Sequence, residues 1–502
     1  MAIDAAMRRF CLSAFAFSLL LTGCGDDNKG SGGSGGTAGI GGSGGTGGTG
    51  GMAGTGGSGG TGGMAGTGGS GGMAMGLNKL NHIVVIYLEN HSFDNLYGSF
   101  PGAEGLTQAA SRPQQQDLTG TVYATLPQPM DTSMRPPVPD TRFPNNLPNA
   151  PFDIGQYVPA NQNIPDLVHR YYQEQAQIHA GAMDRFAAVS DAAGLSMGYY
   201  STDVLPLKPV AQQYTVCDHF FHGVFGGSYM NHIWLISANV ATFPNAPTAM
   251  IATVDAQGNM LTDGAVSPDG HVINTAFTVN NPHPASVPAA NRVPSQTFMT
   301  IGDLLSTHNV TWAWYSGGWN AALAGFADSR FQFHHQPFAY FANFADGTAA
   351  KRDHLKDESD LTAGIAAGNL PQVVFWKPLG ANNEHPGYTD LITGENHTLA
   401  MVQSIMQSPL FRDTAIIITY DEHGGFYDHV APPARDQWGP GSRVPTIVIS
   451  PYAKRNNVDH TVYMTESILS LIEHRFTPGS NLGGPDATAA DMEAAFDFTQ
   501  MP

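Results

Sequence analysis

Five short apolar runs, each followed at once by polar or turn-forming residues, constrain the fold of this 502-residue chain more than any other feature. The first, HIVVIYL, is apolar from its second residue onward and rich in β-branched side chains. Unbroken apolar runs of this length are typical of strands that are buried on both faces of a sheet. The predicted strands are 82–88, 310–315, 372–376, 415–420 and 446–450.

Stretches with a helical spacing of apolar residues lie between and after these runs. Residues 399–406 precede the fourth predicted strand, and residues 467–476 follow the fifth. Strands that alternate with helices favour an α/β fold with a largely parallel sheet. Ligands bind beyond the carboxyl ends of the strands in such sheets, and that is where the polar residues of this chain fall.

The glycines divide the chain into two different parts. Of 60 glycines, 28 lie between Gly25 and Gly76, where the sequence MAGTGGSGG begins at Met52 and again at Met64. Gly/Ser/Thr tracts behave as flexible coils, so residues 24–76 are interpreted as a tether, or as a tract without a selected role. Residues 77–502 form one large folded body, in which the Pro-, Gln- and Asn-rich segment 107–165 is expected to be an irregular insertion.

Residues 1–23 have the features of a lipoprotein signal peptide. Arg8 and Arg9 precede an apolar run over residues 10–21, which has the length of a signal-peptide core and is too short to span a bilayer. The run ends in Leu-Thr-Gly-Cys, which resembles the bacterial lipobox and makes Cys24 the expected site of lipidation. We therefore expect export and a lipid anchor in the bacterial cell envelope, in the periplasm or at the cell surface. An ordinary signal peptide that is cleaved nearby is the alternative.

The charge balance argues against one class of partner. The net charge is −19, and all of the excess lies after residue 76, where 19 Lys and Arg face 38 Asp and Glu. An acidic body of this kind argues against binding to nucleic acid. It does not exclude small anionic substrates, because a bound metal ion can supply a local positive charge. Only Cys217 lies in this body, which therefore has no internal disulfide.

Two clusters of polar residues follow the first and the fourth predicted strands. Glu89 and Asn90 come after one strand, and Asp421, Glu422 and His423 come after the other. Because the carboxyl ends of parallel strands meet at one edge of a sheet, both clusters could face a single pocket. Oxygen donors with some imidazole suit a hard or borderline divalent cation. Any one of these residues alone would be interpreted as a helix cap or a surface carboxylate.

Ser228 lies in a segment that is suited to bind an anion. It follows Gly226 and Gly227 and opens an apolar helical run. Its hydroxyl would lie at a helix N-terminus, where free N–H groups and the helix dipole favour negative charge; a plain N-cap serine is the simpler reading. A serine nucleophile needs activation, which a metal ion held by the carboxylates would supply.

Histidines complete the candidate site. All 19 lie after residue 76, and several have polar neighbours. Imidazole can protonate a leaving alkoxide near neutral pH, so a few of them would serve metal-assisted displacement at a tetrahedral anion. The residues by themselves indicate an anionic-ester hydrolase. The candidate histidines are His169, His334, His335, His385 and His429.

Three segments resemble the signatures of a known family. The segment ENHSFDNLYG, which begins at Glu89, looks like the E-N-x-S-F-D-x-x-x-G signature of the bacterial phosphoesterase family. This family holds acid phosphatases and nonhaemolytic phospholipases C. The segment TYDEHGGFYDHV, which begins at Thr419, resembles the second signature, and residues 443–452 resemble the segment that follows it. The resemblance extends over about residues 80–476.

This resemblance implies an alkaline-phosphatase/sulfatase-like α/β core and a phosphoesterase catalytic domain over residues 77–502. It implies that Ser228 is the nucleophile that becomes phosphorylated. The ligands it implies for one divalent metal ion, of unknown identity, are Glu89, Asn90, Ser228, Asp421 and Glu422. The catalytic histidines it implies are His334, His335, His385 and His169.

The segment around Ser228 favours one branch of the family. The phospholipase C branch typically has G-P-[ST]-x-P-N-R there, whereas this chain has GGSYMNH over residues 226–232. Together with FHHQPF over residues 333–338, this is more similar to the acid-phosphatase branch. The chain also ends soon after its motifs, which predicts that it lacks the C-terminal β domains of the larger phospholipases C.

The sequence therefore predicts a phosphoric-ester hydrolase, namely an acid phosphatase that acts on small phosphomonoesters. The runner-up is a phospholipase C-type phosphodiesterase that acts on phosphatidylcholine-like lipids. A noncatalytic, surface-tethered binding protein is the alternative from another class.

Overall fold

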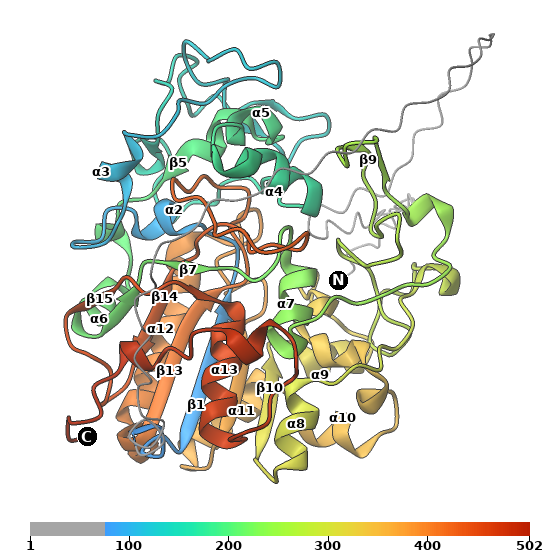
Figure 1. The fold of residues 1–502 in the computed structure, drawn as a ribbon, viewed down its shortest axis with the longest axis vertical. Coiled ribbons are helices and arrows are strands. Elements are labelled where there is room, and N and C mark those ends of the chain that lie inside the picture. The colour runs from blue at the N-terminus through green and yellow to red at the C-terminus, as the bar shows by residue number, and fades with distance from the viewer. Residues whose placement is uncertain (1–75) are drawn as a thin grey trace, which may run out of the picture.

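An eight-stranded sheet forms the centre of the computed structural model, which describes residues 76–502 (Figure 1). The strand order is β11-β10-β12-β1-β13-β14-β6-β15. From β11 to β13 neighbouring strands are parallel, β14 is antiparallel to both of its neighbours, and β6 and β15 are parallel again. The predicted α/β class with a mostly parallel sheet is confirmed. The strands are β1 His82–Leu88, β6 Thr215–Cys217, β10 Trp312–Ser316, β11 Leu355–Asp357, β12 Val373–Lys377, β13 Thr414–Tyr420, β14 Thr446–Ile449 and β15 Asn457–Asp459.

The predicted strands are present at nearly their predicted bounds. Strand β1 matches the prediction, and β10, β12, β13 and β14 each begin and end within two residues of theirs. The side chains of β10, β12, β13 and β14 are all buried, as are those of β1 after His82, because the strands are covered on both faces. Strand β14 runs opposite to β13, so that Thr446 pairs with Thr419. The beginning of β14, rather than its end, therefore lies at the edge where the parallel strands terminate.

Helices cover the sheet on both faces. In Figure 1, α13 lies in front of the sheet and α12 behind it. The predicted helical stretches 399–406 and 467–476 fall inside these two helices. Asp390 is the N-cap of helix α12, and its carboxylate accepts a hydrogen bond from the Thr393 N–H. The longer helices are α4 Tyr171–Ile178, α7 Ser228–Ser237, α8 Ile301–Thr307, α11 Glu358–Ala366, α12 Leu391–Gln407 and α13 Thr465–Phe476.

Residues 107–165 lie above the carboxyl ends of the parallel strands (Figure 1). Their regular structure consists of short pieces: the end of α3 Leu106–Ala109, the strands β2 Met130–Asp131, β3 Val138–Pro139 and β4 Phe152–Asp153, and one 3₁₀ turn. Much of this segment is therefore a surface cover over the edge of the sheet where ligands bind in such folds.

The N-terminal predictions cannot be placed on this fold. The signal peptide 1–23, the lipidation site Cys24 and the tether up to Gly76 lie outside the described residues, except for Gly76 itself.

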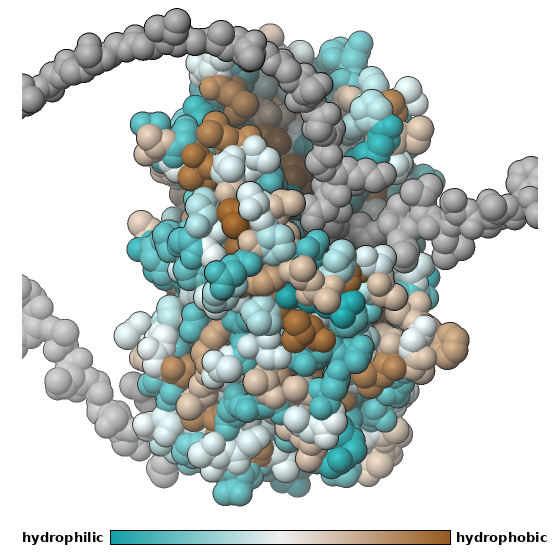
Figure 2. All heavy atoms as spheres, turned by 90° about the vertical axis from the view of Figure 1, so that its right-hand side faces the viewer, coloured by the Kyte–Doolittle hydropathy of each residue, from teal (hydrophilic) through white to brown (hydrophobic). Residues whose placement is uncertain are grey.

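Within residues 76–502, no helix is long and apolar enough to cross a membrane. On the face shown in Figure 2, hydrophobic side chains gather mainly in the upper half, among hydrophilic ones.

Candidate active site

Three neighbouring strands bring a lysine and two carboxylates together. Lys377 ends β12, Glu89 follows β1, and Asp421 follows β13. The Lys377 Nζ atom lies 2.7 Å from Glu89 Oε1 and 3.7 Å from Asp421 Oδ2, and it donates to the Leu88 carbonyl at 3.2 Å. All three charged side chains are completely buried. The two predicted acidic clusters therefore lie side by side, with a buried cation between them.

Asn90 is oriented by two histidines. Its amide nitrogen lies 3.3 Å from His169 Nε2 and 3.1 Å from His385 Nε2. The opposite ring nitrogens face the carbonyls of Leu167 and Pro386, each at 2.5 Å, so each Nδ1 carries the proton and each Nε2 accepts. The Asn90 Oδ1 atom has no hydrogen-bond partner within residues 76–502. The two histidines thus turn an amide oxygen toward the site.

Ser228 is the first residue of α7 and is 2% exposed. Gly227 is the N-cap, and Gly226 has a φ of +91°, which favours glycine. A Cβ on Gly226 would lie 2.7 Å from the backbone nitrogen of Tyr171, so no larger residue fits there. The Ser228 hydroxyl lies close enough to Asp421 to lower the pKa of that carboxyl group, and its oxygen has no hydrogen-bond partner within residues 76–502. The tight turn therefore places the hydroxyl against the acidic cluster, at a helix N-terminus that favours an anion.

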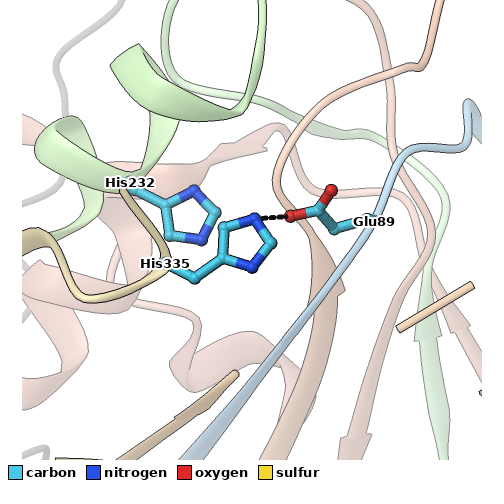
Figure 3. A group of neighbouring side chains, drawn as sticks. All are labelled: Glu89, His232 and His335. Atoms are coloured by element: carbon cyan, nitrogen blue, oxygen red, sulfur yellow. Dashed lines mark ion pairs between the residues drawn. The ribbon is translucent and has the colours of Figure 1, made fainter. Parts of the chain in front are cut away.

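Three histidines line the other side of Glu89. In Figure 3, the rings of His232 and His335 lie face to face, and the Nε2 atom of His335 contacts the Glu89 carboxylate. The two rings are 5.0 Å apart and 6° from parallel. His232 Nδ1 lies 2.7 Å from the Ser228 carbonyl. His334 stands 4.8 Å from His335, and neither of its ring nitrogens has a hydrogen-bond partner in the described part of the chain.

Burial keeps these imidazoles neutral near pH 7. It lowers the pKa of His335 to about 4, against the attraction of Glu89. Burial also holds the pKa values of His232 and His334 well below that of a free histidine. All three rings can therefore act as neutral donors or acceptors until a bound anion favours their protonated form.

The carboxyl groups of the site differ in their protonation. Burial raises the pKa of Glu89, but His335 and Lys377 outweigh it and hold this pKa well below its ordinary range. Burial raises the pKa of Asp421 to about 7, against the attraction of Lys377. Burial, followed by repulsion from Asp421, holds the pKa of Glu422 well above its ordinary range. The site therefore carries more carboxyl groups than its one lysine can keep ionised.

These oxygens fit a divalent metal ion. Atoms of Glu89, Asn90, Asp421 and Glu422 are buried without a hydrogen-bond partner among residues 76–502. Buried polar atoms are rarely left unpaired, and carboxylate and amide oxygens are preferred ligands of hard cations. Glu89, His232 and His335 also have donor atoms within 4.8 Å of one another. The predicted ligand set is thus chemically suited to a metal ion.

Sequence reasoning missed Lys377 and His232. Lys377 follows a buried strand of the same sheet, as Glu89 and Asp421 do, and that position was the available signal. His232 lies four residues after Ser228, on the same side of α7.

Two candidate histidines lie outside this cluster. His429 Nδ1 is 2.7 Å from Asp94, beside Arg443. The Nε2 atom of His423 lies 3.6 Å from Glu174. Neither histidine touches the carboxylates around Lys377, so the histidines of this site are the four that the family resemblance implies, together with His232.

Residues 80–477 match the family model of the Phosphoesterase family. The chain belongs to this family. The predictions of the family and of a phosphoric-ester hydrolase are confirmed, and its substrate is a phosphoester.

Curated relatives of this phosphoesterase include enzymes named phospholipase C. Phospholipase C A of Mycobacterium tuberculosis is 26% identical over 468 residues, which cover 85% of this chain and 79% of the relative. The non-hemolytic phospholipase C of Pseudomonas aeruginosa is 24% identical over 84% of this chain and 58% of its own length. Non-specific phospholipase C6 of Arabidopsis thaliana is 33% identical, but over 27% of this chain and 32% of its own.

Two solved structures overlap with part of the phosphoesterase body. One is a protein in the alkaline phosphatase superfamily from Vibrio parahaemolyticus, with a TM-score of 0.32 and 10% identity over 66% of this chain and 73% of that one. The other is the lipoteichoic acid synthase LtaP from Listeria monocytogenes, with a TM-score of 0.30 and 9% identity over 57% and 70%. The fold assignment rests on the sheet described above.

Proposed function

We propose that this phosphoesterase is an acid phosphatase that hydrolyses small phosphomonoesters through Ser228. The observation that carries the proposal is the placement of the Ser228 hydroxyl at the start of α7 and near Asp421, beside carboxylate oxygens that have no hydrogen-bond partner within residues 76–502. One divalent metal ion would be held by Glu89, Asn90, Asp421 and Glu422 with Ser228 beside it. When bound, this ion would supply positive charge to the phosphoryl oxygens and to the developing alkoxide of the serine.

The side chains of the site divide the remaining work. Free N–H groups at the start of α7 bind phosphoryl oxygens. The Ser228 oxygen attacks phosphorus and its proton passes to the neighbouring Asp421 carboxylate. The bond to the leaving oxygen breaks as His334, which the bound anion favours in its protonated form, gives that oxygen a proton. Water then cleaves the phosphoserine and releases inorganic phosphate.

His232 is the observation that favours a monoesterase over a phospholipase. By the family resemblance, the phospholipase C branch typically has arginine at this place, whereas here a neutral imidazole stacks on His335 and contacts the carbonyl of Ser228. The permanent charge and the five donors of a guanidinium are therefore absent beside the nucleophile. The predicted site residues are also at most 8% exposed, and His169 is the most exposed of them. This burial suits a small phosphomonoester.

A phospholipase C-type phosphodiesterase is the second candidate, supported by the names of the curated relatives over most of their length. Two assays on the purified chain separate the candidates: phosphate release from p-nitrophenyl phosphate and phosphocholine release from phosphatidylcholine vesicles. We expect the first to exceed the second by at least ~10²-fold in kcat/KM. Phosphocholine release without monoesterase activity would overturn the proposal. No activity in a metal-loaded chain on either substrate would favour a binding protein.

We also propose that the enzyme is exported and anchored through lipidated Cys24, with residues 24–76 as a spacer from the membrane of the bacterial envelope. The supporting observation is the short apolar run that ends in Leu-Thr-Gly-Cys. In cells that express Cys24→Ser, the protein should leave the membrane fraction while its phosphatase activity persists. A variant that stays in the membrane fraction to the same extent would contradict the anchor.

A further inference from the structure

A second buried cluster lies behind the loop that leads into Ser228. Glu174 of α4, His222 and His423 meet there, and all three side chains are completely buried. The two imidazole rings are 5.6 Å apart and 7° from parallel. Glu174 Oε1 lies 2.8 Å from His222 Nε2 and 3.6 Å from His423 Nε2. The proposed catalysis uses none of these groups.

The hydrogen bonds around His222 fix its Nδ1 as a donor. This atom faces Asn231 Oδ1 at 3.3 Å. The Asn231 amide is oriented without ambiguity, because its nitrogen donates to the carbonyls of Val224 and Gly226, both at 3.1 Å, and its oxygen accepts from the Val224 N–H. Nδ1 of His222 therefore carries a proton. In neutral imidazole the other nitrogen, which faces Glu174, is then a bare acceptor.

The same reasoning applies to His423. Its Nδ1 faces the carbonyl oxygen of Phe426 at 3.1 Å, and a carbonyl can only accept, so this nitrogen carries a proton. Its Nε2 has no hydrogen-bond partner within residues 76–502 and points at Glu174. The Glu174 carboxylate already accepts the N–H groups of Gly226 and Ser442, at 2.6 and 3.0 Å. Three acceptor atoms thus converge on one buried point.

We propose that a divalent metal ion of the zinc type binds between Glu174, His222 and His423. A second proton on His222, at Nε2, would satisfy its contact with Glu174. It would still leave the Nε2 acceptor of His423 facing the same carboxylate oxygen. A metal ion satisfies all three atoms. Protein ligands of metals have the same outer pattern, in which a ligating imidazole donates its other N–H to a carbonyl or amide oxygen.

The distances and donor types fit such an ion. Ligand atoms of a tetrahedral zinc site with bonds of about 2.0–2.1 Å are about 3.3 Å apart, between the 2.8 and 3.6 Å separations from Glu174 Oε1. Two imidazoles and one carboxylate suit zinc better than magnesium or calcium. The donors nearest Asp421 are carboxylate and amide oxygens, which suit a harder cation, although Glu89, His232 and His335 offer a set like that of the second cluster.

A metal ion here would hold the loop that carries the nucleophile. Glu174 Oε2 accepts the N–H of Gly226, and His222 contacts Asn231, whose amide nitrogen also lies 3.3 Å from the carbonyl of Gly227. His423 directly follows Glu422. The ion would therefore tie α4, the loop before Ser228 and the segment after β13 to one point, and its role would be to position these segments.

The test counts metal ions in the purified full chain by elemental analysis. In an Asp421→Asn background, which weakens the proposed catalytic site, we expect about one zinc per chain. Adding either Glu174→Gln or His423→Gln should remove that zinc. An Asp421→Asn chain without zinc after growth and dialysis in zinc would overturn the inference. So would a folded double variant that keeps its zinc. No step of this test measures hydrolysis, so its result does not depend on whether the proposed phosphatase activity is correct.

A matched control and a second measurement guard against misfolding. His91 is also buried, at 2% exposed, but both of its ring nitrogens are hydrogen-bonded, to Asn95 at 2.6 Å and to the Glu384 carbonyl at 3.1 Å, so His91→Gln should keep the zinc. If the double variants do not fold, the Asp421→Asn chain is stripped with a chelator and titrated with zinc chloride. We expect its melting temperature to rise by several degrees; a melting temperature that zinc does not change overturns the inference.

Discussion

Two buried charge clusters draw their carboxylates from the same two segments, which begin at Glu89 and Thr419. They differ in whether the carboxylate oxygens have hydrogen-bond partners within residues 76–502. The catalytic cluster holds Glu89 and Asp421 around Lys377. The second cluster, here called the Arg443 network, holds Asp94 and Asp428 around Arg443, together with His429. Arg443 donates to Asp428 at 2.8 Å and to Asp94 at 3.1 Å, and it is completely buried.

The difference lies in the carboxylate oxygens. All four oxygens of Asp94 and Asp428 accept hydrogen bonds from arginine, histidine or backbone groups. Both oxygens of Glu89 and Oδ2 of Asp421 have ion-pair neighbours but no hydrogen bond within residues 76–502. Burial and residue type are alike in the two clusters. Unfilled hydrogen-bonding capacity is what distinguishes a site that takes up a ligand from a network that stabilises the fold.

The largest expected effect concerns two buried serines. Ser228→Ala should lower kcat/KM for p-nitrophenyl phosphate by ~10³-fold or more, because no other group can form the phosphoenzyme. Ser92 caps α2 Phe93–Tyr97, accepts the Asn95 N–H and donates to the Tyr427 carbonyl. Ser92→Ala should therefore cost about 1 kcal/mol of stability and leave activity within a few-fold of the wild type. Equal losses of activity in the two variants would contradict the assignment of Ser228 as the nucleophile and Ser92 as a structural residue.

The two buried cations come next. Arg443→Met leaves Asp94 and Asp428 without a counter-ion and should lower the free energy of unfolding by ~3–5 kcal/mol. Lys377→Met should also destabilise the metal-free chain, but a divalent cation should restore much of that loss by neutralising Glu89 and Asp421. Chemical denaturation with and without added metal measures both effects. If added metal restored the stability of the Arg443→Met chain, or failed to restore that of the Lys377→Met chain, the distinction between the two clusters would be contradicted.

Two histidines give a smaller contrast. His334 has free ring nitrogens, and His334→Gln should lower kcat by ~10²-fold with little change in melting temperature, since it removes the proposed proton donor. His429 donates to Asp94 inside the Arg443 network, so His429→Gln should lower the melting temperature and leave kcat of the folded enzyme nearly unchanged. A p-nitrophenyl leaving group needs little protonation, so phenyl phosphate is the sharper substrate. If His334→Gln has wild-type kcat on phenyl phosphate, another residue is the acid.

The sequence predicted the sheet better than it predicted the site. Unbroken apolar runs identify β1 and β13 because burial on both faces excludes polar residues. Such a run has no direction, so the antiparallel orientation of β14 could not be derived from it. Polar residues at strand ends located Glu89 and Asp421. Lys377 was missed, although it has the same position, because lysine is usually exposed.

The candidate histidines show a second limit. His335, His385 and His429 all have polar neighbours in the sequence, but only the fold determines which of them meet free oxygens. His429 lies eight residues after Asp421, the first candidate ligand on that segment, and forms part of the Arg443 network instead. Residue type and local context therefore find groups that can do chemistry, and the pairing of long-range partners decides which of them are available for it.

The smallest effect tests what happens to a buried carboxyl group with neither an arginine nor a metal to balance it. Burial, followed by repulsion from Asp486, raises the pKa of Glu473 in α13 to about 8. The folded chain then holds a proton between pH 4.5 and 8 that the unfolded chain has released, so this group makes stability fall as the pH rises through that window. Glu473→Gln removes the titration and should reduce the loss of melting temperature between pH 5 and pH 8. An unchanged pH dependence in the variant would mean that Asp486 or another group carries the proton. In that case Glu473, beside Asp486, would not be a suitable reference for Asp428, which is paired with arginine, and Asp421, which lies near oxygens without hydrogen-bond partners in the described part of the chain.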